Sequence, residues 1–178
     1  MTCWFDDGDE PAAPRAATCG RDLQTALEAF ATLPIPGRPP ATLALKVAVA
    51  TGSARRFAVG DPTVQRLDVL AGATLDRMAA GEHFAHPGEV MLDAATVAAL
   101  GPHATLEVSR INPATGDGFA PLQTITVPPV GPRPAVALPV ERMRPWVLPV
   151  VWERYQAGLG AFLGESSEET PPFQDPWR

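Results

Sequence analysis

Proline limits what this chain can fold into more than any other residue type. The sequence has 21 prolines in 178 residues, and many of them gather in two stretches, 34–40 and 128–139. Proline locks φ and has no backbone N–H, so neither stretch can continue a helix or a central strand. We therefore expect regular structure in three parts: before the first stretch, between the two, and after the second.

The first part predicts a short strand followed by a long helix. The segment "TCWF", residues 2–5, reads as a buried strand. Apolar residues then recur at spacings of four and three over residues 11–31, which predicts one buried helical face. Its members are Ala12, Ala16, Cys19, Leu23, Leu27 and Phe30. Cys3 and Cys19 lack the spacing of a zinc site or a disulfide framework, so we interpret them as reduced core residues.

The middle part begins with strand signals. Alternating apolar residues predict a strand over residues 43–49, and "SARRFAVG" (53–60) and "QRLDVLAG" (65–72) predict two more. With "GDPT" as a turn between the last two, the three are expected to pair into one sheet.

From Gly72 onward the apolar period becomes helical, and "HPGE" (86–89) is a turn into a brief strand over residues 90–92. Asp93 is the expected N-cap of a helix over residues 94–100. Two further strands are predicted at 104–111 and 122–127, separated by the turn "NPATGDG". In the third part, a helical stripe is predicted from Trp146, Val150, Val151, Tyr155 and Leu159.

Composition narrows the class of protein. The chain is 46% hydrophobic and 19% charged, with a net charge of −6, as expected for a soluble globular domain in the cytoplasm. Only Arg55 and Arg56 form a basic pair, which argues against nucleic-acid binding. No segment approaches the roughly 20 apolar residues of a membrane span. The histidines His83, His86 and His103 lack partners at metal-ligand spacing and are expected to be at the surface or half-buried.

Four segments taken in order resemble one enzyme family. They are "MTCWFDDGDEPAAPRAATCGRDLQTALEAFA", "LKVAVATGSARRFAVGD", "VLAGATLDRM" and "HPGEVMLDAAT". Together they resemble the second half of a class III nucleotidyl cyclase catalytic domain, most closely the first, C1-like domain of soluble adenylyl cyclases. The resemblance covers residues 1–100. It implies an α/β sandwich, a ferredoxin-like sheet covered by helices, without the family's first strands.

The resemblance also implies a division of the chain. Residues 1–127 would be a partial cyclase-like domain, and residues 128–165 a proline-rich linker with an interdomain helix. The end of the chain, residues 166–178, is expected to be a mobile tail.

The family holds two Mg²⁺ or Mn²⁺ ions with ATP on two aspartates. By the resemblance, both aspartates belong before residue 2, and Asp6, Asp7 and Asp9 come too late to replace them. We interpret these three as a solvated turn. No metal ion or cofactor is therefore expected for this chain.

Three further family positions are degenerate here. Counting from Gly72, the ribose-orienting asparagine is replaced by Asp76, and the phosphate-stabilising arginine, one helical turn later, by Ala80. Arg77 points about 100° around the helix from Asp76, so we do not expect it to substitute. The base-reading position holds Val69, with Asp68 one residue off.

The resemblance therefore implies a cyclase remnant without its own catalysis. It would act as a pairing or regulatory module in cyclic-nucleotide signalling, as a homodimer or as a heterodimer with another cyclase domain. The alternative is a fragment of a two-domain adenylate cyclase, which makes cAMP and diphosphate from ATP, with its metal-binding strands and second domain outside this chain.

Overall fold

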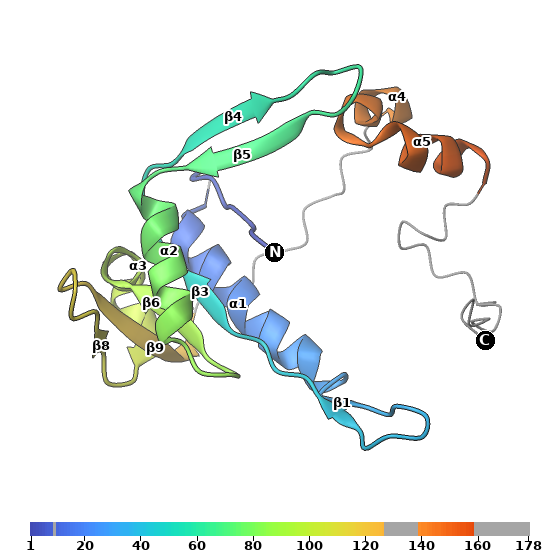
Figure 1. Ribbon diagram of the computed structural model, residues 1–178. Coiled ribbons are helices and arrows are strands. Elements are labelled where there is room, and N and C mark those ends of the chain that lie inside the picture. The colour runs from blue at the N-terminus through green and yellow to red at the C-terminus, as the bar shows by residue number, and fades with distance from the viewer. Residues whose placement is uncertain (9, 127–138, 159–178) are drawn as a thin grey trace. The chain divides into compact units, whose positions relative to one another are not determined.

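A computed structural model describes residues 1–8, 10–126 and 139–158 (Figure 1). The chain divides into two compact units. The first takes in Met1–Arg55 and Leu70–Arg133, and the second Arg56–Val69 and Pro134–Arg178. Of the predicted linker and tail, residues 128–138 and 159–178 lie outside the described residues.

The first unit is built on one mixed sheet in the order β3-β6-β9-β7, with β8 also paired to β9. Only β3 and β6 are parallel, and the other pairs are antiparallel. The five strands are β3 (Val47–Val49), β6 (Val90–Asp93), β7 (Ala104–Leu106), β8 (Arg110–Ile111) and β9 (Gly118–Ile125). Among the described residues, none pairs with the outer side of β3, so β3 is an edge strand.

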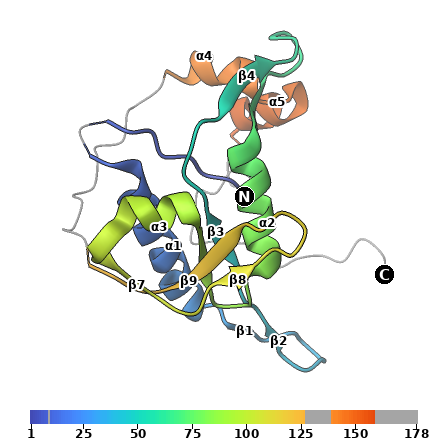
Figure 2. The same ribbon diagram turned by 90° about the vertical axis from the view of Figure 1, so that its left-hand side faces the viewer.

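Helices cover both faces of this sheet (Figure 2). The helices are α1 (Ala12–Glu28), α2 (Ala73–Phe84) and α3 (Ala94–Leu100), the last followed by the 3-10 turn η1 (Gly101–His103). Val90 and Leu92 of β6 pack toward α1 and α3, whereas Met91 packs toward α2. This alternation is the period of two that a strand buried on both faces requires. The expected α/β sandwich, a sheet covered by helices, is therefore confirmed.

The long N-terminal helix is confirmed as α1, but its buried face is not the predicted one. Ala13, Ala17 and Gly20 are buried, one position on from Ala12, Ala16 and Cys19. A Cβ atom on Gly20 would lie 3.0 Å from Val90 Cγ1 and 3.2 Å from Val47 Cγ1. The helix thus approaches the sheet too closely for large side chains, and its larger apolar residues are left half-buried or, like Phe30, exposed.

The predicted strand at residues 2–5 is wrong. No strand forms there, Thr2, Cys3 and Trp4 are exposed, and Phe5 is half-buried. A strand needs a neighbour to pair its backbone groups, and no described strand lies beside this segment. The interpretation of Cys3 as a core residue is wrong for the same reason, while Cys19 is half-buried.

The predicted three-stranded sheet is also wrong. Its first strand shortens to β3 and joins the main sheet, because β3 pairs in parallel with β6. A separate short hairpin precedes it, formed by β1 (Thr32–Leu33) and β2 (Ala41–Thr42) around the first proline stretch. The other two predicted strands form a two-stranded sheet of their own, β4 (Arg55–Val59) with β5 (Leu67–Ala71).

The second unit combines most of this β4–β5 hairpin with short helices. They are α4 (Val140–Met143), the 3-10 turn η2 (Arg144–Trp146) and α5 (Pro149–Gln156). The backbone N–H of Arg66 donates to the carbonyl of Pro145, and Gln65 Nε2 donates to the carbonyl of Trp146 at 3.3 Å. The predicted helical stripe is interrupted between Trp146 and α5, and Leu159 lies outside the described residues.

None of the helices in the described part of the chain has the length and apolar character that a membrane crossing requires.

Candidate functional site

The strand–helix turns at one end of the sheet are the candidate site, because parallel strands deliver their carboxyl ends to the same edge. Strand β3 leads into Thr51, and strand β6 ends on Asp93. Helix α2 starts after Gly72 and helix α3 starts after Asp93, so both helix N-termini lie at this edge.

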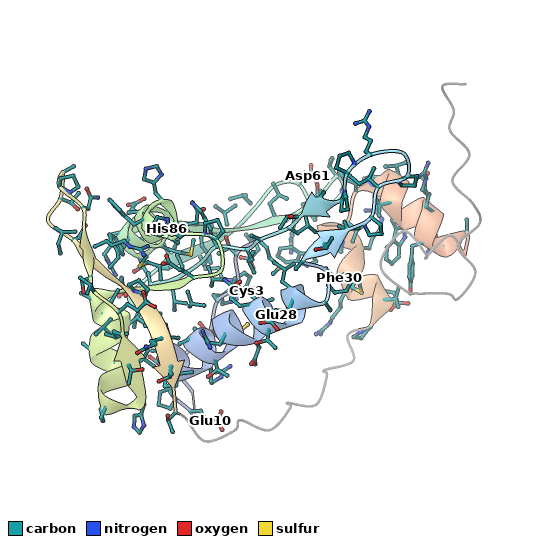
Figure 3. The ribbon with its side chains drawn as sticks, turned by 90° about the horizontal axis from the view of Figure 1, so that it is seen from below. Cys3, Glu10, Glu28, Phe30, Asp61 and His86 are labelled. Carbon is teal, nitrogen blue, oxygen red and sulfur yellow. The ribbon has the colours of Figure 1, made fainter. Side chains whose placement is uncertain are left out.

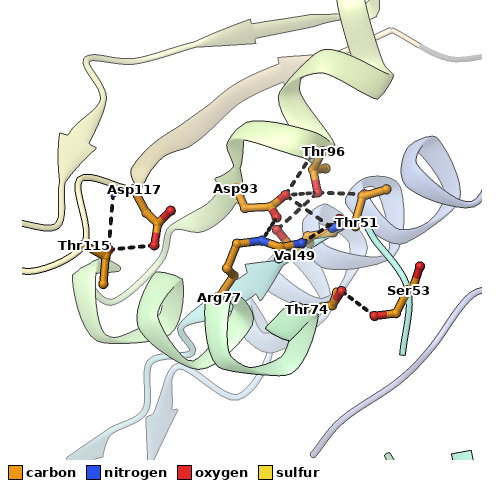
Figure 4. Close-up of polar contacts among 9 residues, drawn as sticks. All are labelled: Val49, Thr51, Ser53, Thr74, Arg77, Asp93, Thr96, Thr115 and Asp117. Carbon is orange, nitrogen blue, oxygen red and sulfur yellow. Dashed lines mark hydrogen bonds and ion pairs between the residues drawn. The ribbon is translucent and has the colours of Figure 1, made fainter. Parts of the chain in front are cut away.

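Asp93 is the centre of the polar contacts in this site (Figure 4). Its side chain is 3% exposed and forms an ion pair with Arg77, with 2.9 Å between Nε and Oδ2. The Asp93 Oδ1 atom accepts from the Thr96 N–H at 2.8 Å, the Thr96 hydroxyl at 2.7 Å and the Thr51 N–H at 3.2 Å. The predicted N-cap is thus confirmed, and the same carboxylate also connects α2 to β3.

Arg77 helps to hold this turn through two of its guanidinium nitrogens. Besides Asp93, it contacts the Thr51 carbonyl through Nη2 at 2.9 Å. The Thr51 and Thr96 hydroxyls lie 2.8 Å apart, and the Thr74 hydroxyl donates to the Ser53 carbonyl at 2.7 Å. The bonds to Asp93 and Thr51 hold the Arg77 guanidinium against protein groups.

Glycine is required at position 52 by this close packing. A Cβ atom there would lie 2.6 Å from Thr74 Oγ1 and 2.9 Å from Arg77 Nη2. Such contacts are shorter than real Cβ atoms show, so a side chain here would displace the Thr74 and Arg77 side chains from their hydrogen bonds.

The predicted degenerate positions fall in both units, and each is described within its own unit. Asp76 is exposed on α2, while Ala80, one turn later, packs against the buried cluster of Ala85, Met91 and Phe119. Val69 belongs to the second unit, where its side chain is 38% exposed. The roles that the resemblance implies for Asp76 and Val69 stay predictions.

Asp68, the neighbour of Val69, is held by Arg56. The two side chains make a two-pronged ion pair across the hairpin, with Nε–Oδ1 and Nη2–Oδ2 distances of 2.8 Å and 2.5 Å. Hydrogen bonds from Arg56 hold the pKa of Asp68 below its usual value. Asp68 is thus an ionised partner of Arg56.

The carboxylates do not suit the two metal ions that the resemblance implies. Asp7 Oδ1 accepts from the Ala12 N–H at 2.9 Å, at the start of α1, and Asp93 is neutralised by Arg77. Within the described ranges, no group of three or more His, Cys, Asp or Glu side chains could hold a metal ion. His83, His86 and His103 are exposed, as expected.

A second ion pair fastens the other end of β6. Arg110 of β8 forms a bidentate ion pair with Glu89, with Nη1–Oε2 and Nη2–Oε1 distances of 2.5 Å each. Arg110 also donates to the Phe84 carbonyl at 2.6 Å. The Arg110 hydrogen bonds are the largest cause that lowers the pKa of Glu89 to about 2. Sequence reasoning missed both this pair and Arg77–Asp93, because each joins elements whose pairing depends on the tertiary register.

Comparison with known proteins rests on structure alone. No protein-family profile matches this sequence, and no curated protein is similar to it. Among solved structures, the chain is similar to the guanylyl cyclase Cya2, with a TM-score of 0.52 and 17% identity over 68% of this chain and 64% of that one. The chain has the fold of a nucleotide cyclase catalytic domain.

Two further solved structures share this cyclase fold. One is the catalytic core of a rhodopsin-guanylyl cyclase with converted specificity in complex with ATPαS, with a TM-score of 0.51 and 15% identity over 67% of this chain and 61% of that one. The other is the guanylate cyclase domain of RhGC from Catenaria anguillulae in complex with GTP, with a TM-score of 0.50 and 15% identity over 66% and 63%. This chain therefore spans less than two thirds of each of these three cyclase structures.

Proposed function

We propose that this chain is a non-catalytic cyclase-fold domain that acts by pairing with another cyclase domain. The observation that carries the proposal is the strand–helix turn at Gly72, where the side chains make contacts that hold the fold together. Arg77 is bound to Asp93 and to the Thr51 carbonyl, Ala80 faces the core, and Asp76 carries a charge that would repel phosphate.

The β4–β5 hairpin offers the pairing surface. Arg56 and Asp68 contact each other, so they share one face of the hairpin, and strand alternation places an apolar set on the other. That set is Phe57, Val59, Leu67 and Val69, with exposed fractions of 45%, 43%, 52% and 38%. An exposed apolar strip of this kind is typical of a protein–protein contact.

Competition with a complete cyclase tests the proposal. A two-domain adenylyl cyclase is assayed for cAMP while the purified chain is added in increasing excess, and complex formation is followed by size-exclusion chromatography. We expect the rate to change with the amount of chain and a complex to elute, because pairing needs the interface and not the catalytic groups.

Two hairpin variants make this test specific. Phe57→Asp forces a charge into the apolar contact and should abolish the effect. Ala58→Asp adds the same charge at the next position, which faces the opposite side, and should leave the effect in place. An unchanged cyclase rate with no complex, or equal behaviour of the two variants, would contradict the pairing function.

The alternative function is a piece of a complete two-domain adenylate cyclase. It is favoured by the coverage, since the chain spans only 61–64% of the cyclase structures it matches. The coding DNA on either side decides between the two: an in-frame segment that encodes the two aspartate strands, or a second cyclase domain downstream, would support the fragment.

A further inference from the structure

The N-terminal segment runs antiparallel along α1, and three contacts define its register. The Ala12 N–H donates to Asp7 Oδ1 at 2.9 Å, and Arg15 Nη1 donates to the Asp6 carbonyl at 3.2 Å. One residue earlier, the Arg15 guanidinium lies over the Phe5 ring, 5.5 Å from its centroid. Residues with lower numbers in the segment therefore lie beside residues with higher numbers in the helix.

In this register, Cys3 is expected to lie beside Cys19. From Phe5 back to Cys3 an extended chain advances about 6.6 Å. From Arg15 to Cys19 a helix advances about 6 Å and returns to the same face. The two steps are nearly equal, so Cys3 should stand beside Cys19 as Phe5 stands beside Arg15.

Two further observations support this placement. Figure 3 shows Cys3 beside α1. After burial, the largest cause that raises the pKa of the Cys19 thiol is the charge of Cys3, followed by that of Asp22. Both cysteines are free thiols, with Cys3 exposed and Cys19 half-buried, so an oxidant in solution can reach Cys3.

We propose that Cys3 and Cys19 are a reversible disulfide site that fastens the N-terminal segment to α1 under oxidising conditions. With a small disulfide such as oxidised glutathione, one cysteine thiolate displaces one glutathione and forms a mixed disulfide. The second cysteine thiolate then displaces the remaining glutathione. Two protein thiols become one S–S bond, their two protons pass to the two glutathione thiolates, and the two electrons reduce the glutathione disulfide.

Equilibration of the full chain in glutathione redox buffers tests the site. After acid quenching and alkylation of free thiols, mass spectrometry gives the fraction of chains with a Cys3–Cys19 bond. The effective concentration of one thiol toward the other is compared in the native chain and in concentrated guanidinium chloride. We expect it to be at least roughly tenfold higher in the native chain, because the fold holds the thiols together.

A relocated cysteine provides the matched control. In the double variant Cys19→Ser with Arg21→Cys, the thiol sits about 200° around the helix at nearly the same chain separation. This variant should lose the native advantage. An equal or lower effective concentration in the native chain, equal oxidation of the relocated variant, or bonds that form only between chains would overturn the site.

Discussion

At the scale of single residues, Asp93 connects three parts of the fold through its side chain. It caps α3, orders Thr51 after β3 and neutralises Arg77 of α2. A carboxylate that is 3% exposed can remain charged only if its lone pairs are satisfied, and four donors satisfy them. Arg77, one residue after the predicted ribose-orienting position Asp76, therefore contributes to stability through Asp93 and the Thr51 carbonyl.

Removing the arginine should expose this dependence. We expect Arg77→Leu to lower the free energy of unfolding by about 2 kcal/mol, because it leaves a buried charge without its partner, while the 30% exposure of Arg77 moderates the loss. Urea unfolding followed by circular dichroism measures the change. Asp76→Asn, the exposed neighbour, is the control and should change stability by less than about 0.5 kcal/mol. Equal losses in both variants would contradict the role given to Arg77.

The Glu89–Arg110 pair should make stability depend on pH. The pKa of Glu89 is lowered from 4.5 to about 2 in the folded chain, so folding favours the ionised form. Its contribution is complete above pH 4.5 and is lost as the pH falls toward 2. The difference in unfolding free energy between the native sequence and Glu89→Gln should therefore be about 2 kcal/mol near neutral pH and shrink below pH 4.5. A difference that stays constant from pH 7 to the acid range would contradict the ion pair.

At the scale of elements, the smallest buried residues of α1 determine how closely the helix packs against the sheet. Ala13, Ala17 and Gly20 let the helix lie close against β3 and β6, and Gln24 completes that face by donating to the Leu45 and Glu89 carbonyls at 3.1 Å and 2.9 Å. The helix is thus positioned by close approach and hydrogen bonds more than by large apolar side chains.

A larger residue at position 20 should separate helix and sheet. Gly20→Leu places atoms where Val90 and Val47 already pack, and we expect it to cost about 2 kcal/mol or more despite the better helix propensity of leucine. Thr25→Leu makes a comparable change at an exposed position of the same helix and should be nearly neutral. Thermal unfolding of both variants gives the comparison, and equal melting temperatures would show that α1 does not pack as described.

The elements also show which features of the fold local sequence signals can predict. Helical period alone predicted α1, and the side chain of Asp93 predicted the start of α3, because both signals are local. The buried face of α1 and the partner of β3 depend on contacts with β6, far away in the sequence, as in Gly20 with Val90 and Val47 with Val90, and no local pattern encodes them. The turn at Gly72 was recognised by resemblance, but the commitment of Arg77 to Asp93 required the fold.

At the scale of the whole molecule, the sheet of the first unit has an edge without a partner. Strand β3 is unpaired on its outer side among the described residues. Several large apolar side chains are also exposed near the end of α1 and the β1–β2 hairpin, namely Phe30, Leu33, Ile35 and Leu43. Open edges and apolar patches of this kind invite association.

We therefore expect the purified chain to self-associate. Sedimentation velocity across a range of micromolar concentrations should show a mass that rises with concentration, and Phe30→Lys should reduce it by placing a charge in the apolar patch. Arg21→Lys, a conservative change at an exposed site on α1, is the control. A concentration-independent monomer would show that the exposed apolar surface is tolerated in water.

The central claim, that a cyclase fold is kept here without cyclase chemistry, is tested most directly by measuring cyclic nucleotide formation. The purified chain is incubated with ATP or GTP and with Mg²⁺ or Mn²⁺, and cAMP and cGMP are quantified by mass spectrometry. We predict no product above that of heat-denatured protein, because Asp76 and Ala80 stand at the catalytic positions that the resemblance assigns and Arg77 is held by Asp93. Turnover that rises in proportion to the chain and disappears in Asp76→Ala would contradict the claim.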